Sequence, residues 1–386
     1  MTRTRTAILL MLLLAAGLGT FVWQSRPPPK PAYVLGILGN FKGRSAQVGI
    51  ESFNAILLAY ETYRETHPGG FDLTLRPVDD SWEADRTRSA YLSCADEADL
   101  LIILTGSSLI TLIHDDILQR PDKVHALLGP TTTRLSGQRD NMVRNMADLE
   151  QEQKHIAAFI SRRNIERLLI VIDDEFNAEY TVPAAQVFQA HAGIPRIDMV
   201  RFSGSRMDTE QVQAHLRQTR YDAMYALLGG LPREAGILIQ QARAIQPDLP
   251  VLITPWVRGL VFEQALGNES SGIFMPSHVK LNDNPAYDRF AEAYRRKFGA
   301  ESSEYFVPLM HDLASSLFRA LDRAGSANAD DLLPVLLAGN YAGTAGSFRY
   351  DEFGDADSQL HFYEKSAGTW RYVASEPSLP PKEPLP

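Results

Sequence analysis

Short, uninterrupted apolar runs that alternate with longer helical patterns constrain the fold of this chain more than any other feature. The runs Leu100–Leu104 and Arg167–Ile172 are apolar almost throughout, and each neighbours a segment whose apolar residues recur with the helical period. A strand that is apolar on both faces is typical of a parallel sheet covered by helices on both sides. The pattern therefore predicts an α/β architecture.

The strand–helix pattern occurs twice in succession, in a chain of 386 residues that is long enough for two domains. We expect a first series with strands at 33–39, 71–78, 100–104 and 125–128, and helices at 45–65, 84–95 and 107–118. We expect a second series with strands at 167–172, 199–202, 223–228 and 251–254, and helices at 148–162, 182–191, 209–219 and 233–245. Helices at 285–298, 305–324 and 329–337 follow, and strand-like pieces around 346–350, 359–363 and 370–373 close the pattern. The prediction is two doubly wound lobes with parallel sheets.

The first thirty residues have the pattern of an export signal. Arg3 and Arg5 precede the uncharged run Ala7–Trp23, and three prolines follow at 27–29. Small residues at 15–19 suit a cleavage site. The 17-residue run would also span about 25 Å as a helix, close to the hydrocarbon thickness of a bilayer. Residues 7–23 are therefore expected to be either a cleaved signal or a retained membrane anchor, and no cysteine follows them for lipid attachment.

Composition and missing motifs exclude several classes of protein. The net charge of −9, with no basic tract beyond the N-terminus, argues against a nucleic-acid partner. A single cysteine, Cys94, rules out an internal disulfide and argues against a cysteine-based metal site. No phosphate-binding, nucleophile-elbow or zinc-protease motif is found, so we expect no cofactor, no metal and no enzymatic activity.

Two pairs of carboxylates follow predicted strands, Asp79-Asp80 and Asp173-Asp174. Paired carboxylates can act as general acid and base, so a hydrolase that uses Asp79 or Asp173 remains an alternative. The favoured interpretation is that they hydrogen-bond within turns or cap the next helix.

Three polar loops each follow a predicted strand and precede a predicted helix, at 39–45, 105–108 and 129–133. Ligands of open parallel sheets bind outside the carboxyl ends of the strands. Helix N-termini there offer free N–H groups, and Ser and Thr add hydroxyls. These loops therefore predict a site for a carboxylate or another small polar group.

The loop at 39–45 and the residues after it, from Gly39-Asn40-Phe41-Lys42-Gly43-Arg44-Ser45 to Phe53-Asn54-Ala55, resemble the opening of the leucine/isoleucine/valine-binding proteins. These are type I periplasmic substrate-binding proteins of ABC transporters. The resemblance covers nearly all of 33–373. It continues through Asp79-Asp80, Gly106-Ser107-Ser108, Pro130-Thr131-Thr132-Thr133, the segment 229–243, and segments at 294–299, 320–326 and 348–355.

The resemblance implies two α/β lobes joined by a three-crossover hinge that close on a small ligand. It suggests residues 31–147 with 256–330 as lobe I, 148–255 with 331–374 as lobe II, and a Pro-rich tail at 375–386. It also implies a periplasmic location, branched-chain amino acid transport, and two partners. These are a small-molecule ligand and a membrane permease or another inner-membrane protein.

The resemblance further implies which residues bind the ligand. Ser107 or Ser108, with Thr131, Thr132 and Thr133, match the positions that hold the ligand carboxylate, and Phe176 matches an aromatic cover from the second lobe. Phe41 and Arg44 join this set from the loop after the first strand, where Lys42 and Arg44, with Arg258, would add positive charge.

This chain departs from the family pattern at three of the ligand-binding positions. Trp256 stands where the family has an acid for the ammonium group, and the family's aromatic positions fall on Gly230 and Val48. A buried ammonium without a counter-charge is costly, so an α-amino acid would need Asp173 or Asp174. We expect instead a small carboxylate or amide-like ligand with Trp256 as a stacking wall. The leading function is an exported solute-binding protein, and the alternative is a membrane-anchored sensor or accessory protein of the same fold.

Overall fold

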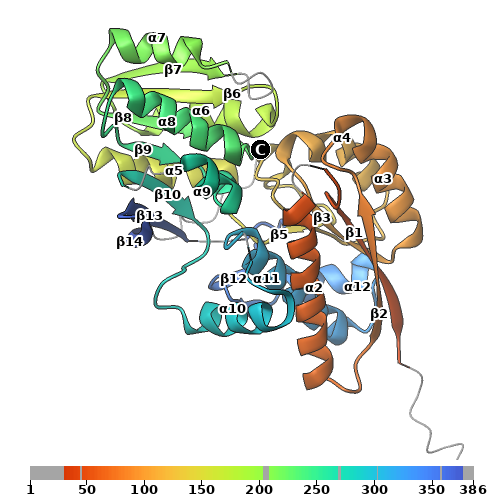
Figure 1. The fold of residues 1–386 in the computed structure, drawn as a ribbon. Coiled ribbons are helices and arrows are strands. Elements are labelled where there is room, and N and C mark those ends of the chain that lie inside the picture. The colour runs from red at the N-terminus through yellow and green to blue at the C-terminus, as the bar shows by residue number, and fades with distance from the viewer. Residues whose placement is uncertain are drawn as a thin grey trace, which may run out of the picture.

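The computed structural model describes residues 30–43, 46–202, 208–267, 271–301, 303–356 and 359–376. The expected signal or anchor at 7–23 and the expected site residue Arg44 lie outside the described residues. Among the helices that are described, none is both long enough and apolar enough to cross a membrane. Figure 1 shows two lobes side by side, each a sheet flanked by helices.

The first lobe contains a five-stranded sheet in the order β2-β1-β3-β4-β5, and all of its neighbouring strands are parallel. Its strands are β1 (Ala32–Gly39), β2 (Asp72–Asp79), β3 (Leu100–Leu104), β4 (His125–Leu128) and β5 (Met142–Arg144). Its helices are α2 (Ala46–Thr66), α3 (Ala84–Glu97), α4 (Ser107–Leu118) and the short η1 (Thr133–Leu135). The buried run Leu100–Leu104 occupies the central strand, as expected of a strand covered on both faces.

The second lobe contains a seven-stranded sheet in the order β14-β13-β10-β9-β8-β6-β7. Its strands are β6 (Arg167–Asp173), β7 (Arg196–Phe202), β8 (Ala223–Leu227), β9 (Val251–Ile253), β10 (Ile273–Ser277), β13 (Leu360–Ser366) and β14 (Thr369–Glu376). Its helices are α5 (Leu149–Ser161), α6 (Ala178–His191), α7 (Glu210–Gln218), α8 (Pro232–Ile245), η2 (Pro255–Val257) and α9 (Leu260–Leu266). The sheet is parallel from β7 to β10, but β13 and β14 are antiparallel, so it is mixed rather than wholly parallel.

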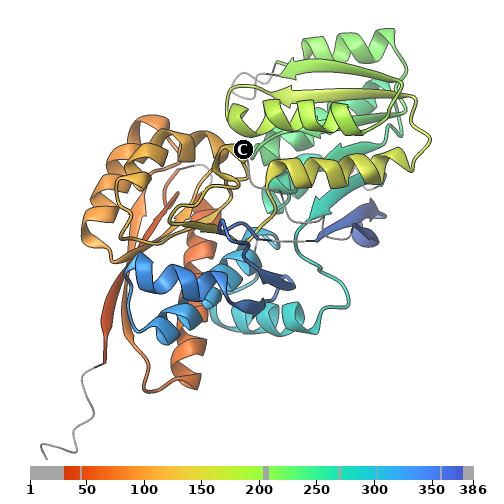
Figure 2. The same ribbon diagram turned by 180° about the vertical axis from the view of Figure 1, so that it is seen from behind.

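The remaining elements return to the first lobe. They are α10 (Pro285–Phe298), α11 (Phe306–Ala324), α12 (Ala329–Leu337) and the hairpin β11 (Asn340–Ala342) with β12 (Ser347–Arg349). Helix α11 packs along α2. Arg144 of β5 forms a buried ion pair with Asp355, which follows the hairpin in the sequence. Figure 2 shows the blue α12 on the first lobe, whereas the β13–β14 hairpin lies at the edge of the second sheet.

The chain therefore passes between the lobes three times, after β5, after β10 and after β12. The expected division has 256–330 wholly in the first lobe and 331–374 wholly in the second. Strand pairing argues against the first of these boundaries, and helix packing argues against the second. Strand β10 pairs with β9 and β13 of the second sheet, and α12 packs on α11 of the first lobe. We propose that the changes of lobe lie near residues 146 and 278 and between β12 and β13. The expected tail also begins later, because β14 reaches Glu376.

Candidate ligand-binding site

The lobes meet where strands of the first lobe end and helix α6 of the second begins. The Ser108 backbone N–H, in the first turn of α4, donates to Asn177 Oδ1 at 3.0 Å. In return, the Glu179 backbone N–H at the start of α6 donates to Ser108 Oγ at 3.2 Å. Each helix N-terminus is thus capped by a side chain from the opposite lobe, which satisfies N–H groups that lack a partner within the helix.

Gly229 lies close to Asn177 and holds its side chain in place. Its Nδ2 donates to the Gly229 carbonyl at 3.3 Å. A Cβ at Gly229 would lie 2.9 Å from the Cβ of Asn177, so a larger residue there would displace the asparagine. Arg134 of η1 and Glu179 of α6 add an ion pair across the lobes at 3.2 Å. The Arg134 side chain is 65% exposed, so this ion pair contributes little to the stability of the contact between the lobes.

Four of the predicted site residues come together on one side of this junction. Ser107 Oγ accepts hydrogen bonds from the backbone N–H groups of Thr131 and Thr132, both at 3.2 Å. Thr132 Oγ1 caps the following turn by accepting from Arg134 N–H. The Thr131 hydroxyl is buried and has no hydrogen-bond partner in the described part of the chain. The loops after β3 and β4 are therefore one connected polar unit, to which Ser108 adds the contact with the second lobe.

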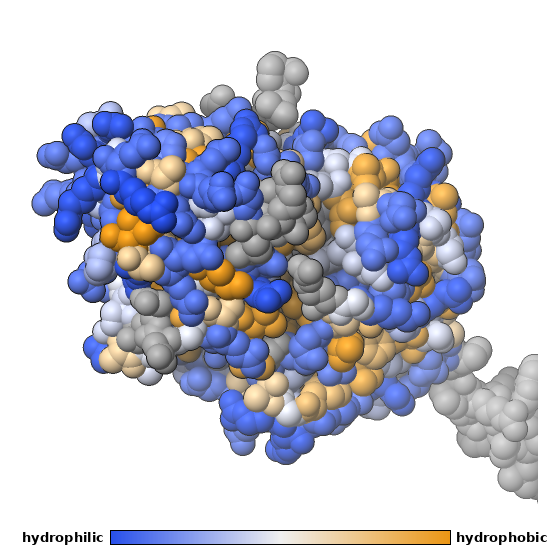
Figure 3. Space-filling view, turned by 45° about the horizontal axis from the view of Figure 1, so that its top comes forward, coloured by the Kyte–Doolittle hydropathy of each residue, from blue (hydrophilic) through white to orange (hydrophobic). Residues whose placement is uncertain are grey.

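The predicted aromatic residues occupy different environments. Phe176 is 42% exposed, and its ring lies against Gly230. Phe41 packs edge-to-face on Phe53 of α2, with ring centroids 6.3 Å apart. Its backbone N–H donates to Asp79 Oδ1. Phe176 thus has a surface to offer a ligand, whereas Phe41 packs mainly against its own lobe. Most of the molecular face seen in Figure 3 is hydrophilic, with hydrophobic side chains in scattered patches.

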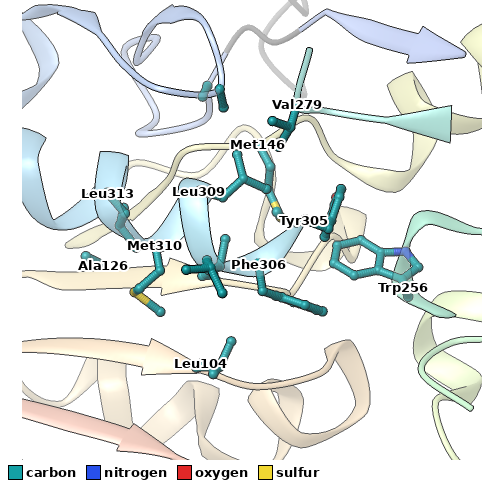
Figure 4. Close-up of a cluster of buried hydrophobic side chains, with 14 of the residues drawn as sticks. Leu104, Ala126, Met146, Trp256, Val279, Tyr305, Phe306, Leu309, Met310 and Leu313 are labelled. Atoms are coloured by element: carbon teal, nitrogen blue, oxygen red, sulfur yellow. The ribbon is translucent and has the colours of Figure 1, made fainter. Parts of the chain in front are cut away.

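Trp256, predicted as a stacking wall, is only 9% exposed. Its ring packs edge-to-face against Tyr180 of α6 and Tyr305, at centroid distances of 5.8 and 5.3 Å, and lies 5.8 Å from Phe306. Figure 4 shows the indole beside Tyr305 and Phe306, with Met146 and Val279 of two crossovers nearby. The indole therefore fills the junction between the lobes and has little free face for a ligand.

A buried carboxyl lies behind this aromatic cluster. Glu152 of α5 is fully buried, and its Oε1 accepts from the Tyr180 hydroxyl at 2.7 Å and from Gln153 Nε2 at 3.0 Å. Its Oε2 lies 3.6 Å from Nε2 of His278. Burial raises the pKa of Glu152 to about 7, and burial lowers the pKa of His278 to about 3. The sequence analysis did not include Glu152 or His278 in the predicted site. The two residues are far apart in the sequence, and only the path of the chain through the crossovers brings them together.

The carboxylate pairs hold turns, as the favoured interpretation expected. Asp79 accepts from the backbone N–H groups of Phe41 and Lys42 and from Ser81. Burial opposes ionisation of Asp79, but these hydrogen bonds outweigh it, and its pKa lies below the ordinary value. Asp80 caps the next turn through Trp82 N–H and Thr87.

The second pair of carboxylates, Asp173-Asp174, also has partners within its own lobe. Asp173 accepts from the backbone N–H groups of Glu175 and Phe176, and Asp174 forms an ion pair with Arg201. Neither carboxylate is therefore a ready counter-charge for a ligand ammonium group. Arg258 pairs with Glu304 and stacks on Trp370, so it is not a free cation either.

Asn177 is the main residue of this junction that the sequence analysis missed. Its position just before α6 fits a helix cap, and an asparagine there is a recognisable start signal. The sequence alone gives no indication that its side chain reaches the other lobe instead.

The chain is similar to a known protein family in sequence and to known proteins in structure. A model of the periplasmic binding protein family matches residues 33–369. A leucine-binding protein, LivK, from Thermotoga maritima is similar in structure, with a TM-score of 0.78 at 20% identity over 89% of this chain and 99% of that chain. The Streptococcus pneumoniae branched-chain amino acid binding protein LivJ, solved with isoleucine, has a TM-score of 0.74 at 16% identity, covering 91% and 100%.

A solute-binding protein from Rhodopseudomonas palustris, solved with 3,4-dihydroxybenzoic acid, is also similar. Its TM-score is 0.75 at 18% identity, covering 90% of this chain and 97% of that chain. At these identities the structural likeness establishes the fold. A search of curated protein sequences found no match.

Proposed function

This chain belongs to the periplasmic binding protein family, whose model spans residues 33–369, and on that premise we propose that it is an exported, non-enzymatic solute-binding protein of an ABC transporter. It would capture a small polar solute where the two lobes meet and deliver it to a membrane permease. The observation that carries the proposal is the reciprocal contact of Ser108 with Asn177 and Glu179, because it brings two helix N-termini together across the lobes.

The same contact supports a carboxylate or amide as the recognised group. The Oδ1 of Asn177 is an amide oxygen, and it occupies the N–H of Ser108. A carboxylate or amide oxygen of a solute is the chemical equivalent of that atom and would compete for the same donor. The nearby helix N-terminus favours negative charge at this point. The hydroxyl groups of Ser107, Thr131, Thr132 and Thr133 would supply further hydrogen bonds, and Phe176 would cover the solute.

The charges around the junction favour a solute without an ammonium group. Asp173 and Asp174 have partners in their own lobe, and Trp256 stands where the resemblance expects an acid. An ammonium left without a counter-charge would cost several kcal/mol. Among the similar proteins, one was solved with isoleucine and another with 3,4-dihydroxybenzoic acid. We favour simple carboxylates of the second kind, or amides, for this chain.

Titration calorimetry with a defined panel tests the proposal. The panel contains benzoate, 4-hydroxybenzoate, benzamide, leucine and isoleucine. We expect binding of a carboxylate or amide that lacks an ammonium group. Ser107→Ala, Thr132→Ala and Thr133→Ala should weaken that binding, whereas Ser89→Ala on the exposed surface of α3 should not. Unchanged affinity in all three site variants would refute the assignment.

A tethered sensor or accessory protein of the same fold is the second candidate. The apolar run Ala7–Trp23 favours it, because its length approaches that of a membrane span. Fractionation of the producing cells separates the two candidates. Release into the periplasm supports the transport role, and retention with the inner membrane supports the tethered role.

A further inference from the structure

A pocket of about 590 Å³ lies at the hinge, away from the proposed solute site. Its lining includes a residue from each crossover, namely Asn145, His278 and Gln359. The hairpin β11–β12 forms another part of the wall. None of the residues that line it belongs to the loops after β3, β4 or β6. The volume is in the range of small-molecule sites.

Two buried side chains of this lining have polar atoms without partners. Asn145 is 3% exposed; its Nδ2 donates to the Leu309 carbonyl at 2.7 Å, and its Oδ1 has no hydrogen bond among the described residues. His278 is 4% exposed; its Nε2 lies 3.6 Å from Glu152 Oε2, whereas its Nδ1 has no hydrogen bond within the described ranges. Buried polar groups are nearly always satisfied in native proteins, so a polar group bound in the pocket could complete the hydrogen bonding of Asn145 Oδ1 and His278 Nδ1.

The required hydrogen-bonding chemistry of that occupant follows from these atoms. Asn145 Oδ1 accepts only, so the occupant must donate to it. Burial lowers the pKa of His278 to about 3, so its ring is neutral, and Nδ1 offers the pocket either a donor or an acceptor according to the tautomer. One hydroxyl group can donate to Asn145 Oδ1 and accept from His278 Nδ1 when that nitrogen carries the proton; in the other tautomer a second hydroxyl of the same ligand donates to Nδ1.

The charges in the pocket do not favour an ion of either sign. Asp312 lines the pocket, but its carboxylate already accepts from the backbone N–H groups of Thr344 and Ala345, at 2.7 and 2.8 Å. Arg349 contributes a cation from its exposed position on β12. Burial lowers the pKa of His361, also in the lining, to about 4, so this ring is neutral. One anion and one cation leave no net charge for a charged ligand to neutralise.

An aromatic wall completes the pocket. Tyr341 and Phe348 pair across the hairpin with ring centroids 5.3 Å apart, and both line the cavity. Aromatic side chains supply apolar contact area that suits the C–H faces of a small ring. From these features together, we propose that the hinge pocket binds a small neutral polyhydroxylated compound, a monosaccharide or a polyol.

Such a ligand would act on the movement of the lobes, because it would touch all three crossovers. If opening of the lobes changes the spacing of Asn145, His278 and Gln359, the ligand binds one arrangement better than the other. Binding in the pocket and binding at the proposed solute site would then affect each other reciprocally.

Ligand-observed NMR and calorimetry on the full chain test the proposal. The probes are D-glucose, D-xylose and sorbitol, with sodium acetate as the anionic comparison. We expect at least one of the three neutral probes to bind and acetate not to compete with it. Ser347→Trp would place an indole in the pocket from an exposed position on β12 and should weaken the affinity at least about tenfold. Ser89→Trp on α3 is the matched control and should leave the affinity unchanged.

Two further measurements separate the hinge pocket from the solute site. Phe348→Leu keeps the wall apolar but removes the ring, and it should also weaken the binding of the neutral probe. Ser107→Ala should not abolish that binding, because Ser107 does not line the hinge pocket. The proposal is overturned if none of the neutral probes binds and a crystal structure shows only water on Asn145 and His278. It is overturned equally if acetate displaces the probe, if Ser347→Trp has no effect, or if Ser107→Ala abolishes binding.

Discussion

Single side chains join the two lobes at their junction: Ser108 contacts Asn177 and Glu179, and Trp256 packs between Tyr180 and Tyr305. The loops with Ser107 and Thr131–Thr133 are predictable, because polar residues that follow buried strands gather at one edge of a parallel sheet. The replacement of the expected acid by Trp256 is also visible in the sequence. Its packing against Tyr180 and Tyr305 is not, because those residues come from distant segments that only the fold brings together.

Glu152 makes the stability of the protein depend on pH. The pKa of the Glu152 carboxyl is about 7 in the folded protein, whereas a glutamate outside that environment has a pKa of 4.5. As pH rises from 4.5 to 7, the unfolded chain loses this proton while the folded chain keeps it. Relative to Glu152→Gln, the wild type should therefore lose about 1.4 kcal/mol of unfolding free energy per pH unit, roughly 3 kcal/mol in all. The neutral His278 contributes to both proteins and cancels in the difference.

Denaturant unfolding of both proteins at several pH values measures this effect. The wild type should gain stability relative to the variant as pH falls from 7 to 4.5, with no further change below that range. Parallel stability curves for the two proteins would show that the Glu152 carboxyl is not perturbed by burial.

Asn177 should hold the lobes together when no solute is present. Asn177→Ala removes the acceptor of Ser108 N–H and the donor to the Gly229 carbonyl. Only the hydrogen bond with Ser108 crosses between the lobes, and loss of its net contribution of about 1 kcal/mol would shift the balance towards separated lobes. Small-angle X-ray scattering should detect a larger radius of gyration. Gln186→Ala, an exposed amide on the same helix, is the control, and an equal effect of both variants would argue against the contact.

Whole elements are the scale at which the sequence is most informative. The period of the apolar residues in α2 and the continuous apolar run of β3 place both elements correctly. Strand β10 was missed, since it is short and contains Pro276, which argues against a strand in a sheet interior. The antiparallel pairing of β13 and β14 was also missed, because the sequence does not show which edge of which sheet they join.

The position of α2 against the loop after β1 depends on Gly49. A Cβ at this position would lie 2.0 Å from the Asn40 carbonyl oxygen, a backbone atom that cannot move aside cheaply. Alanine favours helix over glycine by about 1 kcal/mol, but overpacking costs about 1–3 kcal/mol. We expect Gly49→Ala to lower the unfolding free energy in denaturant titration. Gly69→Ala, where nothing lies within 4 Å, should change it little, and equal effects would contradict the proposed clash.

At the scale of the whole molecule, two lobes and three crossovers form a hinged pair with polar loops at the junction. The tandem strand–helix series predicts the two lobes, and the family resemblance predicts the hinge. The boundaries at the second and third crossovers were misplaced, because α10–α12 and the hairpin β11–β12 return to the first lobe after β10 has completed the second sheet. No local sequence signal marks such a return.

The distance between the lobes tests the central claim most directly. Spin labels at Ser89→Cys on α3 and Gln189→Cys on α6 would report it, because both positions are exposed, whereas the native Cys94 is buried and its pKa is raised to about 11. Pulsed electron resonance would be recorded with and without the carboxylate or amide that binds in calorimetry. We expect a shorter and narrower distance distribution at saturation, and loss of that change in Thr132→Ala at the same solute concentration. A distribution that stays the same while the solute is bound would contradict capture between the lobes.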